Sequence, residues 1–253
     1  MEDIVIRVNH LTKSYRKGHD QLEVLKGIDL EINAGEVIGY LGSNGAGKST
    51  TVKILCGILT DFGGEVNILG MDVRKDPLGI KRRIGYIPEN ALMYEHLTPR
   101  EYLEFIGSMY NMTPADTQES IQNLLKRFGM LDHINERMTA FSKGMKQKIH
   151  IISGILHNPE ILFMDEPLNG LDANAVIMIK EMIAQLAGEG KTIFYCSHLM
   201  DIVEKVASRI VLIDQGVVVA NGSLTELEAA EGTSSLEALF AKLTNPHTPE
   251  NQE

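Results

Sequence analysis

The chain has 253 residues, 43% of them hydrophobic, and a formal net charge of −10 at pH 7. This length supports one large domain or two closely packed lobes, and the acidic balance excludes a general nucleic-acid binder, which needs a basic face. Cys56 and Cys196 show no metal-binding or disulfide spacing, so we expect two buried thiols in a reducing compartment. The N-terminus lacks a signal-peptide pattern, and no apolar run reaches the roughly 18–20 residues of a membrane-spanning helix. We therefore expect a cytoplasmic protein that would need a partner to act across a membrane.

The first third of the chain alternates between strand patterns and one glycine-rich loop. Period-two alternation predicts strands over residues 4–8 and 28–32, and a nearly continuous apolar run predicts a buried strand over 36–41. After the loop and a helical segment, further strands are predicted over 65–69 and 82–87.

The middle of the chain is predicted to be helical. Thr98 and Thr113 each precede a proline and an acidic residue in the spacing of a helix N-terminus, and Gly129 ends the second helix. Because strand-rich sequence lies on both sides, we predict that this segment forms an inserted helical lobe.

Strand and helix patterns alternate again towards the C-terminus. A strand is predicted from Ile161, a hairpin turn at Gln215-Gly216, and a last helical region after the capping box Ser223–Glu226. We expect one α/β domain over 1–243 that divides into a core lobe (about 1–90 and 159–230), a helical lobe (about 91–158) and a C-terminal helix (about 231–243), followed by a disordered tail at 244–253.

The glycine-rich loop is the first segment whose sequence indicates a chemical function. The segment "GSNGAGKST", Gly42 to Thr50, fits the pattern G-x-x-x-x-G-K-[ST], in which glycines let successive backbone amides face one phosphate. In this pattern Lys48 reaches the β- and γ-phosphates and Ser49 offers its hydroxyl to Mg²⁺. A glycine turn that contains Lys-Ser by chance is the alternative. The preceding strand and following helix favour a nucleoside-triphosphate site.

Two further strands end in residues suited to the same site. Asp165 and Glu166 follow a buried strand, and His198 follows the next one, so all three should reach the carboxyl edge of the sheet, where open α/β sheets bind ligands. Asp165 would hold Mg²⁺, Glu166 would polarise the attacking water and His198 would contact the γ-phosphate. An acidic turn and a structural histidine are the alternatives.

The ordered set "GSNGAGKST", "PEN", "FSKGMKQK", "ILFMDEP", "NGLDAN" and "CSHLM" resembles the nucleotide-binding subunits of ATP-binding cassette (ABC) transporters over about residues 3–243. The resemblance implies a P-loop ABC-type ATPase core with an N-terminal antiparallel β-subdomain and an inserted α-helical subdomain. It implies ATP and Mg²⁺ as ligands, with Glu166, His198 and Lys48 as catalytic residues and Ser49, Glu89 and Asp165 at the metal. The implied nucleotide contacts are Tyr15, which would stack on adenine, and Gly42, Ser43, Asn44, Gly45, Ala46, Gly47, Lys48, Ser49 and Thr50.

The resemblance also implies a second subunit. "FSKGM" matches the signature loop, whose Ser142 and Gly144 would contact the γ-phosphate bound to the opposite copy, and Asp172 matches an interface residue. The sequence departs from the usual pattern in two places, of which the first is the signature loop, where Lys143 replaces a glycine and Met145 a glutamine. At "IPEN", Glu89 replaces a glutamine. These variants are similar to the subgroup paired with ABC-2-type permeases, which are commonly exporters.

The leading interpretation is an ATPase that drives a separate permease from the cytoplasmic face of the cell membrane, as a homodimer or with a paralogue. We expect Leu92, Met93 and Tyr94, after Glu89, to dock a helix of the permease; packing inside the helical lobe is the alternative. A soluble ABC ATPase without transport role and a regulatory ATP switch remain open as other functions.

Overall fold

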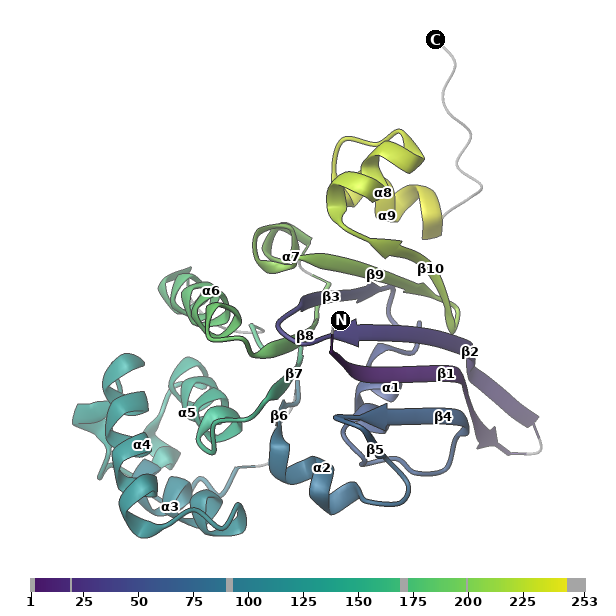
Figure 1. Cartoon of the computed structure of the whole chain (residues 1–253). Coiled ribbons are helices and arrows are strands. Elements are labelled where there is room, and N and C mark those ends of the chain that lie inside the picture. Colours follow the sequence, from purple (N-terminus) through teal and green to yellow (C-terminus); the bar gives the residue numbers. More distant parts are fainter. Residues whose placement is uncertain (1–2, 19, 90–92, 169–172, 199, 245–253) are drawn as a thin grey trace.

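The computed structural model describes residues 3–18, 20–89, 93–168, 173–198 and 200–244, and places them around two β-sheets (Figure 1). The predictions for Leu92 and Asp172, and for the tail beyond 244, lie outside the described residues. One sheet has six strands in the order β10-β9-β3-β8-β7-β6, with β3, β6, β7, β8 and β9 parallel and β10 antiparallel. These strands span Val37–Gly42 (β3), Ile84–Ile87 (β6), Ile161–Asp165 (β7), Thr192–Cys196 (β8), Arg209–Asp214 (β9) and Val217–Gly222 (β10).

The second sheet is antiparallel, with the order β2-β1-β4-β5. Its strands span Ile4–Lys17 (β1), Asp20–Asn33 (β2), Gly63–Ile68 (β4) and Met71–Asp72 (β5). The described helices are α1 (Lys48–Leu55), α2 (Pro77–Arg83), α3 (Pro99–Met109), α4 (Pro114–Arg127), α5 (Lys143–Ile155), α6 (Ala173–Gly188), α7 (Met200–Val206), α8 (Leu224–Glu231) and α9 (Leu236–Thr244). The predicted α/β class with a second, antiparallel sheet is confirmed.

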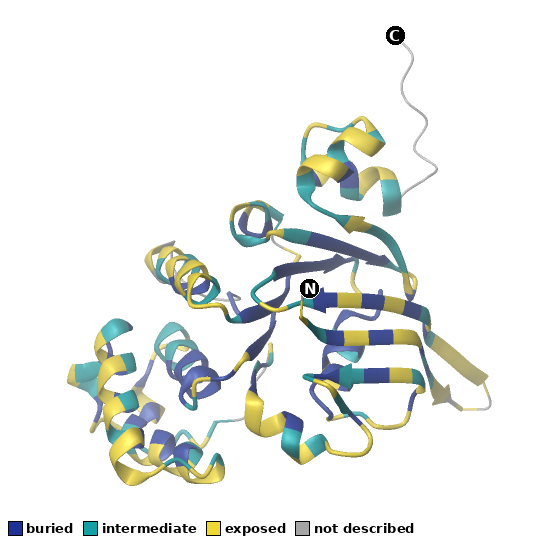
Figure 2. Cartoon of the chain, in the orientation of Figure 1, coloured by how far each residue is buried: buried dark blue, intermediate teal, exposed yellow. Residues whose placement is uncertain are grey.

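The inner strands β3, β7 and β8 of the six-stranded sheet are buried on both faces, which explains their continuous apolar sequences (Figure 2). Successive side chains of a strand point to opposite faces, so β3 divides its residues between two cores. Ile38 and Tyr40 join the core shared with α1 and the antiparallel sheet. Val37 and Leu41 join the core formed with helices α3 to α9. The sheet is therefore the central layer, and its carboxyl edge is left for a ligand.

The β1–β2 hairpin is much longer than the strands predicted over 4–8 and 28–32. The register of β1 against β2 shifts between Val8 and Leu11, and His10 has a positive φ of 48°. Such bulges interrupt the two-residue alternation, so the outer half of each strand shows no strand pattern in the sequence. Both cysteines are buried and unpaired, as expected.

The strand predicted over 82–87 is wrong at its beginning. Residues 77–83 form α2, and β6 starts only at Ile84. Asp76 caps the helix by accepting a hydrogen bond of 2.8 Å from the Gly79 backbone N–H, and Pro77 occupies the first turn. Asp-Pro before a basic run was a helix-start signal that the sequence analysis missed.

Helix α5 packs against β6 with almost no space between the two backbones. A Cβ atom on Gly85 would overlap the carbonyl oxygen of Gly154, and a Cβ atom on Gly154 would lie 2.7 Å from Cγ1 of Ile87. Glycine at both positions therefore permits a direct backbone contact between α5 and the central sheet.

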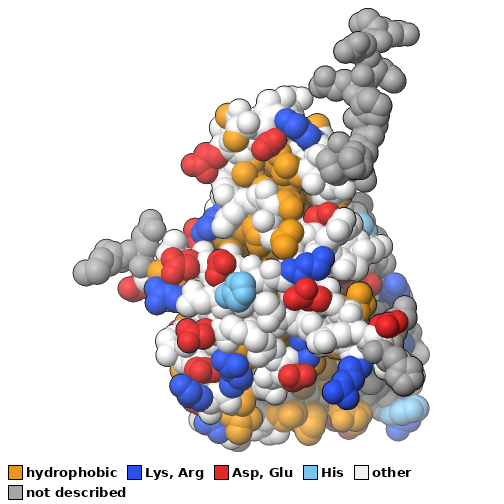
Figure 3. Space-filling model, turned by 90° about the vertical axis from the view of Figure 1, so that its right-hand side faces the viewer, with side chains coloured by type: hydrophobic (Ala, Val, Ile, Leu, Met, Phe, Trp, Pro, Cys, Tyr) orange, Lys and Arg blue, Asp and Glu red, His pale blue; other side chains and the backbone are white. Residues whose placement is uncertain are grey.

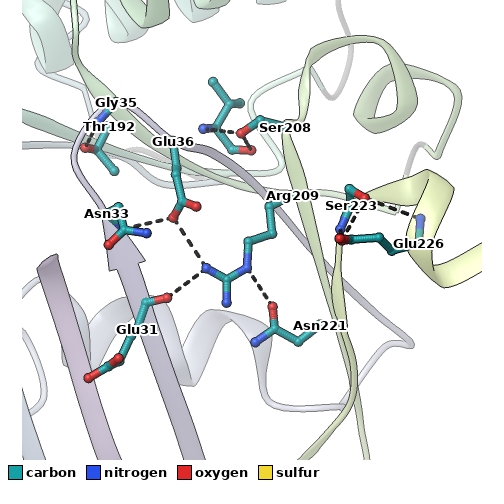
Figure 4. Close-up of polar contacts among 11 residues, drawn as sticks. Glu31, Asn33, Gly35, Glu36, Thr192, Ser208, Arg209, Asn221, Ser223 and Glu226 are labelled. Atoms are coloured by element: carbon teal, nitrogen blue, oxygen red, sulfur yellow. Dashed lines mark hydrogen bonds and ion pairs between the residues drawn. The ribbon is translucent and has the colours of Figure 1, made fainter. Parts of the chain in front are cut away.

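An arginine network joins the two sheets at the end opposite the ligand edge (Figure 4). The Arg209 guanidinium donates to the Asn221 side chain at 2.8 Å and to the Glu31 carbonyl at 3.0 Å, and lies 3.5 Å from the Glu36 carboxylate. These contacts connect β9 with β10, β2 and the start of β3, and so fix the orientation of the antiparallel sheet.

The C-terminal helices pack on the same side of the central sheet as α7. Leu236 and Leu239 of α9 are fully buried, and the Leu236 backbone N–H donates to the Glu204 carboxylate at 2.9 Å. Figure 3 shows hydrophobic side chains gathered beneath these helices, above a surface of mixed charge. No helix within the described ranges is long and apolar enough to cross a membrane.

His157 predicts a pH dependence of stability. Its ring stacks on Tyr110 at 3.6 Å and its Nε2 lies 2.9 Å from the Ile84 carbonyl, and burial lowers its pKa to about 4, helped by the nearby Lys191 charge. The unfolded chain takes up this proton near pH 6.5, so stability is constant above that pH and falls as pH decreases towards 4. From this residue we expect a loss of roughly 2 kcal/mol at pH 5.

The measurement is urea unfolding at pH 7.5 and pH 5. His157→Gln keeps an amide donor for the Ile84 carbonyl but does not titrate, so its loss between the two pH values should be smaller than that of the unmodified chain. An equal loss in both proteins would contradict the assignment.

Candidate functional site

The glycine-rich loop follows β3 directly and opens α1, as predicted. Gly45 and Gly47 have positive φ values of 85° and 111°, which favour glycine, and a Cβ on Gly47 would lie 2.6 Å from Leu25 Cδ2. The loop therefore curls tightly and directs backbone amides and the N-terminus of α1 towards one point, an arrangement suited to an anion.

Lys48 lies within this loop and is buried. Its Nζ donates to the carbonyls of Gly42 at 2.7 Å and Ser43 at 3.2 Å, so the ammonium group is held at the centre of the loop. The Ser43 hydroxyl is in turn bonded to Asp214 at 3.1 Å, which ties the loop to the end of β9. The charge needed to bind phosphates is thus in place.

Asp165 has the features of a metal-binding carboxylate. It is 3% exposed, and its buried Oδ1 has no hydrogen-bond partner among the residues that the structure describes. Burial raises the pKa of Asp165, and the Glu166 and Glu89 charges add to the rise, whereas a hydrogen bond from Ser49 and the Lys48 charge oppose it. A buried carboxylate oxygen without a partner, beside a serine hydroxyl, fits a hard cation such as Mg²⁺.

Glu166 directly contacts His198. The Glu166 Oε2 lies 2.9 Å from His198 Nδ1, and the side chain of Glu166 is 10% exposed whereas that of His198 is 54% exposed. Glu166 has a positive φ of 49°, an uncommon conformation for a residue with a long side chain. Its backbone N–H donates to the Cys196 carbonyl at 2.9 Å, which stabilises this turn.

Ser197 was not predicted from the sequence. This serine is 1% exposed, and its hydroxyl donates to Glu166 Oε2 at 3.2 Å. Its place between the end of a strand and the predicted histidine was the only signal available, and serine at a strand end is too common to be singled out.

One cavity of about 630 Å³ brings most of the predicted residues together. It also includes apolar residues that the sequence did not indicate, of which Phe240 comes from the C-terminal helix α9. The lining is Leu22, Val24, Leu41, Gly42, Ser43, Asn44, Gly45, Gly47, Lys48, Ser49, Thr50, Glu89, Asp165, Glu166, Ser197, His198, Met200 and Phe240. A volume of this size suits a nucleotide-sized ligand.

Two predicted nucleotide contacts do not line this cavity. Ala46 points into the core beneath the loop, 2% exposed. Tyr15 lies on the outer part of β1, where its ring centroid is 4.9 Å from Lys13 Nζ. Leu22, its cross-strand partner on β2, lines the cavity instead. The adenine-stacking role of Tyr15 stays a prediction.

The residues at 142–147 do not line the cavity of their own chain. Ser142 caps α5, its hydroxyl accepting from the Met145 backbone N–H at 3.2 Å, and is exposed, as is Lys143. Lys143 is the first residue of α5 and has no positive φ, so a side chain is tolerated where glycine was expected. The Gln147 amide donates to the Pro167 carbonyl at 2.9 Å, which links α5 to the loop after Glu166.

Comparison with known proteins supports a nucleotide-binding role. A family model described as "ABC transporter" matches residues 25–169. The chain is 37% identical over 235 residues to the ABC transporter ATP-binding protein NatA of Bacillus subtilis (strain 168), covering 91% of this chain and 95% of that protein. It is 35% identical over 215 residues to the linearmycin resistance ATP-binding protein LnrL of the same organism, covering 85% of this chain and 69% of that protein.

Solved structures have the same fold. An ATP-binding subunit of an ABC transporter superposes with a TM-score of 0.87 at 30% identity, covering 94% of this chain and 99% of that chain. A dimeric structure of a bacterial ABC transporter cassette superposes with a TM-score of 0.80 at 25% identity, covering 87% of this chain and 98% of that chain.

Proposed function

This chain belongs to the ABC transporter family of ATP-binding proteins, and on that premise we propose how its residues hydrolyse ATP to drive a permease. It is an ATPase subunit that energises a separate membrane protein. The observation that carries the mechanism is the single cavity in which the phosphate loop, Asp165, Glu166 and His198 meet.

The phosphate loop would bind the triphosphate through its backbone amides and the Lys48 ammonium. Ser49 and Asp165, with Glu89 beside them, would hold Mg²⁺, which neutralises charge on the phosphate oxygens. Glu166 would accept a proton from the water that attacks the γ-phosphorus. His198, in contact with Glu166 at 2.9 Å, would hydrogen-bond a γ-phosphate oxygen and orient the water.

We propose a dimer in which the site of each copy is completed by the other. Ser142 and Gly144 lie at the start of α5 and do not line the cavity of their own chain. A serine hydroxyl at a helix N-terminus suits a phosphate, so the exposed end of α5 would contact the γ-phosphate of a second chain. Asp172 would lie at the same interface. The solved dimer of a related cassette supports this arrangement.

The permease would dock on an aromatic surface of the helical lobe. Tyr94 and Phe105 are 63% and 43% exposed, and their rings meet edge-on at 5.9 Å between centroids. Exposed apolar side chains that touch each other mark protein contact sites more often than isolated ones do. We propose an ABC-2-type permease in the cell membrane, with this subunit on its cytoplasmic face. The relative named for linearmycin resistance supports an exporter.

Tyr94→Glu tests the docking surface. A buried, unpaired charge in the interface should reduce the amount of permease recovered with the tagged chain from detergent-solubilised membranes of its own host by about tenfold. ATPase activity of the isolated chain should stay within about twofold, because Tyr94 is outside the ATP cavity.

Leu78→Glu is the matched control, since Leu78 is 67% exposed on α2, in the other lobe. It should leave permease recovery unchanged. Equal recovery with Tyr94→Glu and with the unmodified chain would reject this docking surface. Failure to recover any multi-helix membrane protein with the unmodified chain would favour a soluble ATPase without a transport role.

A further inference from the structure

Three consecutive residues at the end of β8 hold both the backbone and the side chain of Glu166. The Cys196 carbonyl accepts from the Glu166 backbone N–H at 2.9 Å. The Ser197 hydroxyl donates to Glu166 Oε2 at 3.2 Å, and His198 approaches the same oxygen with Nδ1 at 2.9 Å and with its backbone N–H at 3.4 Å. The register of the sheet explains this concentration, because Asp165 pairs with Cys196 in the parallel β7–β8 ladder.

The contacts are asymmetric between the two carboxylate oxygens. Within the described part of the chain, every side-chain contact of Glu166 falls on Oε2. An ionised carboxylate offers lone pairs on both oxygens, so Oε1 is left to accept from a water in the cavity. A carboxylate anchored through one oxygen cannot rotate freely, and the other oxygen then has a defined direction.

Of the two residues that contact Glu166 Oε2, Ser197 is the one protected from solvent. The side chain of His198 is half exposed, whereas Ser197 is 1% exposed and lies between the end of the strand and the carboxylate. A hydrogen bond to a charged group is stronger where water is excluded. The serine hydroxyl can therefore hold the carboxylate whether or not the His198 ring moves to contact a nucleotide.

We propose that Ser197 is a positioning residue for ATP hydrolysis, which orients Glu166 so that Oε1 accepts the proton of the attacking water. This inference rests on the proposed role of Glu166 as the base. The water oxygen forms a bond to the γ-phosphorus, the bond from that phosphorus to the bridging oxygen breaks, and ADP leaves with the electron pair. The water proton moves to Oε1 and then to the released phosphate.

The first test compares Ser197→Ala with Ser197→Thr in steady-state ATP hydrolysis. We expect Ser197→Ala to lower kcat by about 10- to 100-fold, the loss typical of one hydrogen bond to a charged group, with the KM for ATP within about twofold. Ser197→Thr should restore most of kcat. Ser153→Ala, which removes another buried hydroxyl, on α5, should leave both constants unchanged.

Ser197→Val distinguishes the loss of the hydroxyl group from a loss of folding. Threonine and valine have nearly the same shape, so a low kcat in the valine variant beside a restored kcat in the threonine variant, at equal melting temperatures, assigns the effect to the hydroxyl. A kcat within about twofold of the unmodified chain for both Ser197→Ala and Ser197→Val would overturn the proposal.

A double variant separates this proposal from the role of Glu166 itself. If Ser197 acts through Glu166, adding Ser197→Ala to Glu166→Gln should lower kcat no further, whereas independent effects would multiply. If Glu166→Gln hydrolyses ATP at the normal rate, the proposed base is wrong. If Glu166→Gln is inactive and Ser197→Ala is fully active, only the inference about Ser197 fails.

Discussion

Glu166→Gln is expected to lower the rate of ATP hydrolysis by about 10²–10⁴-fold, the contribution typical of a general base. The amide has almost the shape of the carboxylate but cannot accept the proton of the attacking water. ATP binding should persist, because Lys48 and the phosphate loop are unaltered. Dimers held together by ATP should therefore accumulate in this variant. Phosphate release and light scattering during gel filtration with Mg²⁺-ATP measure the two effects.

Glu160→Gln is a suitable control for this experiment. Glu160 precedes β7 and pairs with Arg83 at 2.5 Å, outside the ATP cavity, so the same chemical change should leave hydrolysis near the normal rate. Normal hydrolysis by Glu166→Gln would disprove the base assignment. Loss of hydrolysis without ATP-dependent dimers would instead argue against the dimer.

A mixture of two inactive variants should hydrolyse ATP if the signature residues act on the opposite copy. Lys48→Ala removes the phosphate-binding ammonium, and Gly144→Asp places a negative charge where the partner's γ-phosphate would lie. Aspartate in the first turn of α5 suits the helix dipole, so the fold should be kept. In a mixed dimer, one site combines an intact phosphate loop with an intact signature. About a quarter of all sites in an equal mixture are then complete, and activity should recover to about that fraction.

The control mixture combines Lys48→Ala with the double variant Lys48→Ala and Gly144→Asp. No dimer in it contains an intact phosphate loop, so it should stay inactive. An inactive first mixture, despite dimers of normal mass, would mean that Ser142 and Gly144 of one copy do not complete the ATP site of the other.

The phosphate site could be predicted from the sequence because its chemistry depends on local patterns. Gly42 to Thr50 form one continuous segment, and Asp165, Glu166 and His198 lie at or just after the ends of buried strands, so parallel strand ends bring them together. The inner strands of the central sheet are buried on both faces and so have continuous apolar sequences. This is why they could be predicted from the sequence.

Other features depend on pairing between distant segments and left no local signal. The outer half of the β1–β2 hairpin has bulges that remove the alternation, and Leu22 reaches the cavity only because of that pairing. Phe240 lines the cavity because α9 packs beside α7, nearly two hundred residues after the phosphate loop. Ser197 is recognisable only through its distance to Glu166.

The glycine contact between α5 and β6 has a mechanical consequence. Because Gly85 lies against the Gly154 carbonyl oxygen and Gly154 lies against the Ile87 side chain, a shift of α5 on the sheet would bring these groups into collision. We therefore expect α5 and the sheet to move together as one rigid body, with Ser142 at the N-terminal end of the helix. A rotation that moves Tyr94 and Phe105 relative to the sheet would then have to change the packing of α3 and α4 on α5. We therefore expect relative movement to occur where α3 and α4 pack on α5 rather than where α5 packs on β6.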